Sequence, residues 1–257
     1  MKKYNLKIMI IFFLLVYIIS IIYISCYFAN KYINKKENEK IINSVKEMQI
    51  DKKEITDKRS EQILKIEKLQ KENSDIVGWI EIEGTNINYP VLQTTNNEFY
   101  LTHNYNKEYS KTGSIFLDKN VELNKPSTNF LIYGHRSIDG EMFEELIKYK
   151  KEKYYKAHPT IKFTTVNDES EYEIIAVFLS RVYYKKETDV FRYYYFIDAK
   201  NKEEYDYYIN NSKKNSLYDT GKIAEYNEQL LTLSTCEYSK KDGRLAIIAK
   251  KVLEKKQ

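Results

Sequence analysis

The chain has 257 residues, of which 42% are hydrophobic and 31% are charged. This length and composition suffice for one domain of about 180 residues with a packed core, plus a targeting segment. The net charge of +5 is small and acidic residues are interleaved with the lysines, so the sequence has no basic block or arginine-rich face and nucleic acid is excluded as an expected partner.

An uncharged run at 8–30 consists mostly of Ile, Leu, Phe, Tyr and Val. It exceeds the roughly 20 residues that cross the hydrocarbon core of a bilayer as a helix. A cleaved signal peptide is the alternative, but its apolar core is typically about 7–15 residues long, and no small-x-small cleavage site closes this run. We therefore predict an uncleaved single-pass anchor at 8–30.

The orientation of this anchor follows from the flanking lysines. Three lysines and no acid lie in the predicted tail at 1–7, which favours a cytoplasmic N-terminus, although lysines also follow the run. The rest of the chain is then expected on the extracellular side of the cell membrane.

Residues 31–73 are dense in Lys, Glu and Gln, with Ile and Leu at helical spacing, which predicts a helical stalk of one or two amphipathic helices. Packing of its last turns on the following domain is the alternative.

From residue 74 the pattern changes to short strands, and we assign 74–257 to one domain. Two alternating runs at 78–82 and 87–92 are separated by a turn signal, which predicts a hairpin. A helical turn is expected at 97–101. Turn signals at intervals of about 8–12 residues favour an antiparallel barrel or sandwich with sparse helices at its ends and in its connections. Further strands are predicted at 114–117, 129–133, 160–166, 171–184, 230–233 and 244–249, and helices at 140–156 and 202–213.

One thiol stands out in this domain. Cys236 follows the apolar run 230–233 closely, and Arg244 opens the next predicted strand eight residues later. A free cysteine is usually a small buried hydrophobe and a lone arginine usually a solvated charge, but the polar flank Ser-Thr-Cys-Glu argues against simple burial. The other cysteine, Cys26, lies in the predicted anchor, so an intramolecular disulfide is not expected.

A base for this thiol has to come from three histidines. His103 and His158 lie in polar connections and are predicted to face solvent. His135 follows Gly134 at the exit of the predicted strand 129–133, where it can project over the end of a sheet, although a structural histidine is the alternative. The sequence has no zinc-like ligand spacing and no phosphate-binding glycine loop, so we expect no cofactor and no metal.

Three separated motifs carry a resemblance to a known family. The stretch Thr232–Cys236, with Arg244 after it, resembles the active-site segment of sortases, and 131–135 resembles their histidine segment. The sequences Leu-Ser-Thr-Cys-Glu-Tyr, Asn-Ile-Asn-Tyr-Pro-Val and Val-Phe-Arg-Tyr-Tyr together resemble class B sortases most closely, over about residues 75–252. This resemblance implies a closed eight-stranded β-barrel with an N-terminal helical extension and a helix in the connection before the cysteine strand.

The resemblance also implies a function. Such an enzyme is a membrane-anchored cysteine transpeptidase of the Gram-positive surface. It cleaves a C-terminal sorting signal after threonine through a thioester. It then joins the surface protein or pilin to an amine of a peptidoglycan precursor or of a pilin subunit. By correspondence, Cys236 is the nucleophile, His135 the acid and base, and Arg244 the clamp on the substrate carbonyl or oxyanion. The same correspondence puts five residues in the substrate groove: Asn97, Leu101, Tyr133, Ser234 and Glu237.

Two other interpretations stay open from the residues alone. A membrane-anchored β-barrel that serves as a binding or assembly module predicts an inert, buried Cys236. Another cysteine acyl-transferase, such as an L,D-transpeptidase, carries histidine and glycine directly before its cysteine, whereas this chain has Ser234 and Thr235 there.

Overall fold

The computed structural model describes residues 2–51, 55–56, 59–137 and 140–252. Parts of the predicted tail, stalk and catalytic domain, at residues 1, 52–54, 57–58, 138–139 and 253–257, lie outside the described residues. The chain forms two compact units, Met1–Glu47 and Met48–Gln257. In the first, α1 (Lys2–Glu47) runs through the whole predicted anchor, and from Leu6 onward it is long and apolar enough to cross a membrane.

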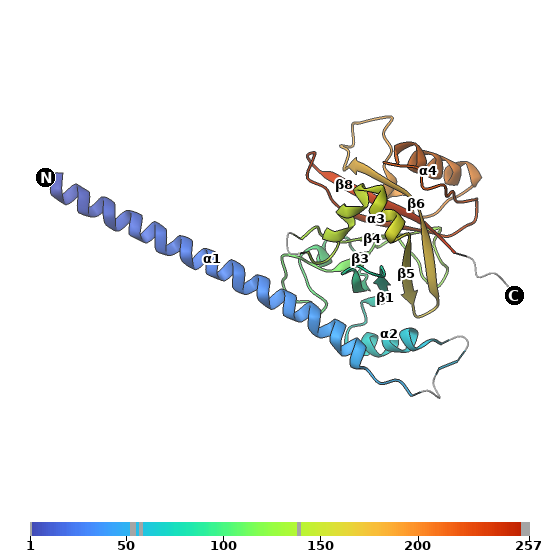
Figure 1. The fold of residues 1–257 in the computed structure, drawn as a ribbon, viewed down its shortest axis with the longest axis horizontal. Coiled ribbons are helices and arrows are strands. Elements are labelled where there is room, and N and C mark those ends of the chain that lie inside the picture. Colours follow the sequence, from blue (N-terminus) through green and yellow to red (C-terminus); the bar gives the residue numbers. More distant parts are fainter. Residues whose placement is uncertain (1, 52–54, 57–58, 138–139, 253–257) are drawn as a thin grey trace. The chain divides into compact units, whose positions relative to one another are not determined.

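The second unit is built around eight strands that close into a barrel, in the order β1-β2-β3-β4-β7-β8-β6-β5 (Figure 1). This confirms the closed eight-stranded barrel that the resemblance implied. The strands are β1 (Ile76–Glu81), β2 (Asn88–Leu92), β3 (Ile115–Leu117), β4 (Asn129–Tyr133), β5 (Thr160–Thr165), β6 (Glu169–Arg181), β7 (Leu230–Cys236) and β8 (Gly243–Lys251).

The pairing of the strands differs from the antiparallel arrangement that the turn spacing favoured. The pairs β2–β3 and β4–β7 are parallel, and the six other pairs are antiparallel. Apolar patterning identifies a buried strand, but it carries no information on the direction of the neighbour. The parallel pair β4–β7 matters for function, because it makes two strands end at the same edge of the barrel.

The helices of this unit lie around the barrel. Helix α2 (Glu61–Glu72) begins after Ser60, whose hydroxyl accepts a hydrogen bond from the Ile63 N–H as an N-cap. It contacts β1 and β5, and its buried residues are Ile63, Leu64, Ile66 and Leu69. The end of the predicted stalk therefore belongs to the barrel unit. The other helices of this unit are α3 (Glu152–Ala157) and α4 (Lys202–Asn215), with short 3₁₀ segments η1 (Phe99–Leu101), η2 (Glu144–Lys150) and η3 (Tyr193–Tyr195).

The predicted helix 140–156 is interrupted. Lys151 has an extended backbone (φ −105°, ψ 121°), which ends η2 and begins α3. Helical spacing of apolar residues continues across this break, so the sequence pattern does not reveal it.

Helix α4 and η3 hold the long connection between β6 and β7 against the barrel. Aromatic side chains from both elements form one buried cluster with apolar residues of β6, β7 and β8. The stacked rings of Phe196 and Tyr208 lie 4.1 Å apart at their centroids, which ties the connection to α4. This packing puts η3 beside the end of β7. The cluster includes Phe178, Tyr193, Tyr205, Tyr208, Ile209, Leu230, Ala246 and Ile248.

Candidate active site

Cys236 is the last residue of β7, and it lies directly opposite Arg244 in the antiparallel pair β7–β8. The Glu237 N–H donates to the Gly243 carbonyl (3.0 Å). The Cys236–Arg244 pair is therefore a non-hydrogen-bonded pair, in which Cα atoms are about 4.5 Å apart and side chains come closest. The strand register thus puts the guanidinium on the same face as the thiol.

The parallel pair β4–β7 brings His135 to the other side of the thiol. Tyr133 is paired with Ser234 at the end of β4, and the Gly134 N–H donates to the Ser234 carbonyl (3.2 Å). Side chains alternate along a strand, so two residues further on His135 is level with Cys236 on the same face.

Gly134 is required for this exit from the barrel. A Cβ atom at this position would lie 2.4 Å from Ile115 Cδ1 and 2.6 Å from Phe143 Cδ2, closer than real contacts allow. The chain therefore passes tightly between β3 and η2 immediately before His135.

The imidazole of His135 is held by one hydrogen bond to the backbone. Its Nε2 lies 2.8 Å from the carbonyl oxygen of Leu101 in η1. A carbonyl oxygen only accepts, so Nε2 carries the proton of the neutral ring and Nδ1 is the basic nitrogen. Leu101, predicted to contact substrate, thus also orients the histidine, and no sequence pattern indicates this second role.

Arg244 is half-buried, and its Nη1 donates to the Gly243 carbonyl (2.8 Å). Within residues 2–51, 55–56, 59–137 and 140–252, no carboxylate forms an ion pair with it. A cation without a counter-ion at a partly desolvated site attracts a negative oxygen, and guanidinium groups match such oxygens in geometry.

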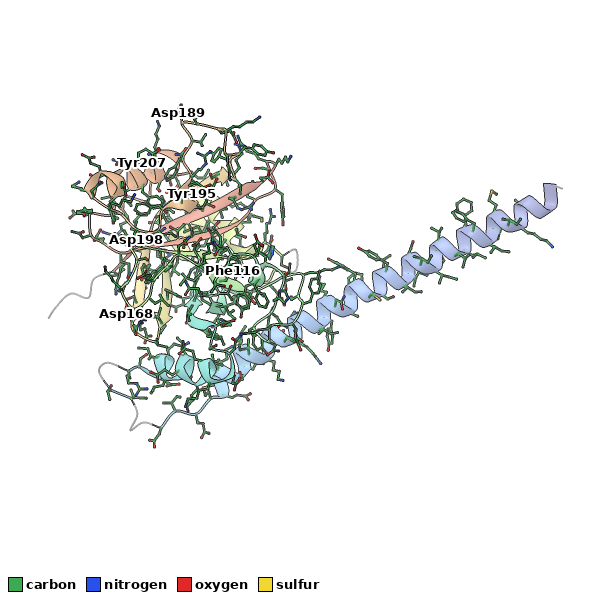
Figure 2. The ribbon with its side chains drawn as sticks, turned by 180° about the vertical axis from the view of Figure 1, so that it is seen from behind. Phe116, Asp168, Asp189, Tyr195, Asp198 and Tyr207 are labelled. Atoms are coloured by element: carbon green, nitrogen blue, oxygen red, sulfur yellow. The ribbon has the colours of Figure 1, made fainter. Side chains whose placement is uncertain are left out.

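The three predicted catalytic residues line one pocket of about 350 Å³. Figure 2 marks Phe116 of β3, which forms part of its wall. The lining comprises Asn97, Leu101, Phe116, Tyr133, Gly134, His135, Val182, Tyr193, Tyr194, Ser234, Thr235, Cys236 and Arg244. Four of the five predicted substrate-binding residues are therefore at this pocket. Among them, Ser234 is buried, with its Oγ 2.7 Å from the hydroxyl of Tyr193.

Glu237, the fifth predicted substrate-binding residue, is not among the residues that line the pocket. Its side chain is 5% exposed and accepts a hydrogen bond from Lys150 Nζ (2.9 Å), and it also accepts from the N–H and hydroxyl of Ser239. Burial alone raises the pKa of Glu237, but the donors from Ser239 and Lys150 outweigh it and lower the pKa to about 2. The structure thus shows Glu237 tying the turn after Cys236 to η2.

This ion pair predicts an acid-dependent contribution to stability. The folded pKa of Glu237 lies below its unfolded value, so the stabilisation is complete above about pH 4.5 and is lost as the pH falls toward 2. Lys150→Met is expected to lower the free energy of unfolding by roughly 1–3 kcal/mol at pH 7, because it leaves a buried carboxylate unpaired. Chemical denaturation of both proteins at pH 7 and pH 3 measures this difference, which is expected to shrink at the lower pH.

Lys156→Met is the matched control, because Lys156 pairs with Glu152 on the exposed surface of α3. Its effect is expected to stay within about 0.5 kcal/mol at either pH. An equal effect of the two substitutions would contradict the structural role of the Lys150–Glu237 pair.

Sequence reasoning missed several residues of the pocket wall. Val182, Tyr193 and Tyr194 come from the connection between β6 and β7. The aromatic run at 190–197 was the available signal, but its position beside β7 depends on packing against α4. His103 and His158, which were predicted to face solvent, are half-buried, and the Nδ1 of each lies 2.8 Å from a backbone carbonyl oxygen.

Comparison with known proteins gives the class of this fold and site. The sortase domain family model matches residues 80–252. The chain belongs to the sortase family.

Its relatives place it more narrowly. The chain is 34% identical over 221 residues to sortase B of Listeria monocytogenes, an alignment that covers 84% of this chain and 86% of the relative. A Staphylococcus aureus sortase B–substrate complex has a TM-score of 0.74 at 28% identity, over 88% of this chain and 99% of that one. Sortase B from Bacillus anthracis in complex with AAEK1 has a TM-score of 0.74 at 30% identity, over the same shares. Among sortases, this is a class B enzyme, a cysteine transpeptidase.

Proposed function

We propose that Cys236, His135 and Arg244 carry the transpeptidase chemistry of this chain. The supporting observation is that strand register brings three groups into one pocket: a thiol, an imidazole with its Nδ1 free of the Leu101 bond, and a guanidinium that no carboxylate of the described residues pairs with. The inert, buried cysteine of a binding module fits this arrangement poorly, because Cys236 is half-buried and lines the pocket.

The proposed reaction follows from these groups. The Cys236 thiol gives its proton to the Nδ1 of His135, and the thiolate attacks the carbonyl carbon of a threonine in the substrate. Arg244 stabilises the oxyanion that forms. His135 protonates the leaving amine, which departs as the C–N bond breaks and leaves a thioester on the enzyme. An incoming amine then attacks the thioester and gives its proton to His135. The thiolate is released, and a new amide bond joins the threonine to the acceptor.

The proposed substrates are proteins with a C-terminal sorting signal. A related solved structure is a sortase B–substrate complex, and the pocket beside Cys236 has room for a few side chains. By resemblance to class B enzymes, the signal is of the Asn-Pro-x-Thr type. The acceptor is an amine of a peptidoglycan precursor or of a pilin subunit.

The proposed location is the cell membrane, with a single pass at 8–30, a cytoplasmic N-terminus and the barrel outside. Helix α1 supports an anchor by its length and apolar composition. This arrangement puts the pocket on the side where exported proteins and wall precursors meet.

One experiment tests both the reaction and the orientation. Intact cells that produce the full chain are given a quenched Asn-Pro-x-Thr peptide library and a membrane-impermeant amine. We expect a new amide between threonine and this amine in the medium, detected by mass spectrometry. Product only after cell lysis would contradict the orientation, and no product before or after lysis would contradict the proposed donor substrate.

A further inference from the structure

Asp118 lies behind the pocket wall and makes no part of its lining. It directly follows β3 and is 3% exposed. Its Oδ2 accepts hydrogen bonds from Asn97 Nδ2 (2.7 Å) and from the Tyr133 hydroxyl (3.1 Å), two side chains of the pocket wall. Its Oδ1 accepts from the N–H (2.9 Å) and the Nδ2 (3.0 Å) of Asn120 in the following turn. Oδ2 therefore holds two side chains of the pocket wall, and Oδ1 holds the turn that follows β3.

The contacts of Asn97 determine which of its groups a ligand meets. Its Oδ1 accepts from the Lys119 N–H (2.8 Å), while its Nδ2 donates to Asp118. Both ends of the side-chain amide are thus fixed. A flipped amide would put its NH₂ group against the Lys119 N–H and its oxygen against the Asp118 carboxylate, and neither pair can form a hydrogen bond. The second N–H of Nδ2 remains, so Asn97 offers the pocket a hydrogen-bond donor.

The contact of Tyr133 has the opposite effect. A phenol has one proton, and here that proton is donated to the carboxylate of Asp118. Burial raises the pKa of Tyr133, and the nearby charge of Asp118 raises it further, so the hydroxyl stays protonated at neutral pH. The ring lies against Phe116, with centroids 5.3 Å apart. Tyr133 therefore offers the pocket the lone pairs of its oxygen, which accept.

We propose that Asp118 is a positioning residue that sets the hydrogen-bond polarity of the pocket wall, with Asn97 as donor and Tyr133 as acceptor. A donor and an acceptor held in this way fit an amide group, which presents a carbonyl oxygen and an N–H. The inference rests on the proposed function, in which the pocket takes a peptide segment. Asp118 acts through the two wall residues and touches neither the thiol nor the imidazole.

Asp118→Asn is the sharpest test, because it keeps the shape of the side chain. Four donors converge on the carboxylate, so an NH₂ group in place of either oxygen faces two of them. In detergent-solubilised full-length enzyme, with the fastest peptide of the Asn-Pro-x-Thr library, we expect KM to rise about tenfold, the change that losing one charge-assisted hydrogen bond implies. We expect kcat to change by less than about threefold and alkylation of Cys236 by iodoacetamide to keep its rate.

Three further variants separate positioning from folding. Asn120→Ala removes one donor to Oδ1 on an exposed turn and leaves the Oδ2 contacts in place, so it is expected to keep the wild-type KM. Asp168→Asn changes another carboxylate, at the β5–β6 hairpin (Figure 2), and is also expected to keep KM. Asn97→Ala is expected to raise KM in the wild type and to add little in the Asp118→Asn background.

The outcomes are distinct. Provided that the wild type turns over the peptide, either of two results would overturn the inference. One is an unchanged KM in Asp118→Asn, and the other is an equal effect of Asn97→Ala on KM in the wild-type and Asp118→Asn backgrounds. An equal rise of KM in Asn120→Ala would also overturn it, because the effect would then come from the turn. If the wild type transfers no acyl group from any library peptide, the proposed function fails first.

Discussion

Cys236→Ala is expected to abolish acyl transfer, with kcat/KM falling by at least about 10⁴-fold, because no other residue that lines the pocket carries a thiol to form the thioester. The substitution removes a single sulfur atom from a half-buried position, so the free energy of unfolding is expected to change by about 1 kcal/mol or less. Quenched-peptide cleavage and thermal unfolding on the same preparation measure the two quantities.

Cys26→Ala is the matched control, since Cys26 is the other free thiol of the chain and lies in α1. It is expected to keep wild-type kcat/KM. Substantial cleavage by Cys236→Ala would show that the reaction does not pass through this thiol.

Arg244→Ala is expected to lower kcat/KM by about 10²–10³-fold, the loss typical when one donor to a developing oxyanion is removed. Arg244 lies beside Cys236 and has no carboxylate partner among the described residues, so its removal leaves no buried charge unpaired. The thermal midpoint is expected to move by only a few degrees. A larger fall in kcat than rise in KM is expected, because the oxyanion exists only in the transition state.

Arg244→Lys keeps the charge but not the planar fork, and is expected to recover only part of the rate. Arg59→Ala makes the same change in net charge on a residue paired with Glu67 of α2, and is expected to leave kcat/KM unchanged. A fall in rate matched by loss of folded protein would contradict a role for Arg244 in the reaction.

The barrel was largely predictable because its strands carry strong local patterns. The hairpin of β1 and β2 has alternating runs around a turn in which Gly84 has φ +74°. The parallel direction of β4–β7 had no such signal, since the residues that determine it lie about 100 positions apart in the chain. The break at Lys151 was equally hidden, because it interrupts the backbone and not the apolar spacing.

The site was predictable in part for the same reason. Each of the three proposed catalytic residues lies at a strand end beside a glycine or a polar segment: His135, Cys236 and Arg244. The resemblance of their motifs to sortases indicated that they act together. The groups that position the site residues were not predictable, because a backbone carbonyl is present in every residue and a carboxylate in many. The Leu101 carbonyl holds His135, and Asp118 holds Asn97 and Tyr133, which lie 21 and 15 residues away in the sequence.

Direct trapping of the acyl-enzyme tests the central proposal, that Cys236 forms a thioester with a cleaved threonine. The full-length protein in detergent is mixed with internally quenched Asn-Pro-x-Thr peptides in the absence of an amine. The reaction is stopped with acid, and the protein is digested for mass spectrometry beside Cys236→Ala treated in the same way. We predict an adduct on Cys236 that ends in threonine, absent from the variant and lost when an amine is supplied. Peptide cleavage without any adduct on Cys236, or an adduct on a different residue, would contradict the proposal.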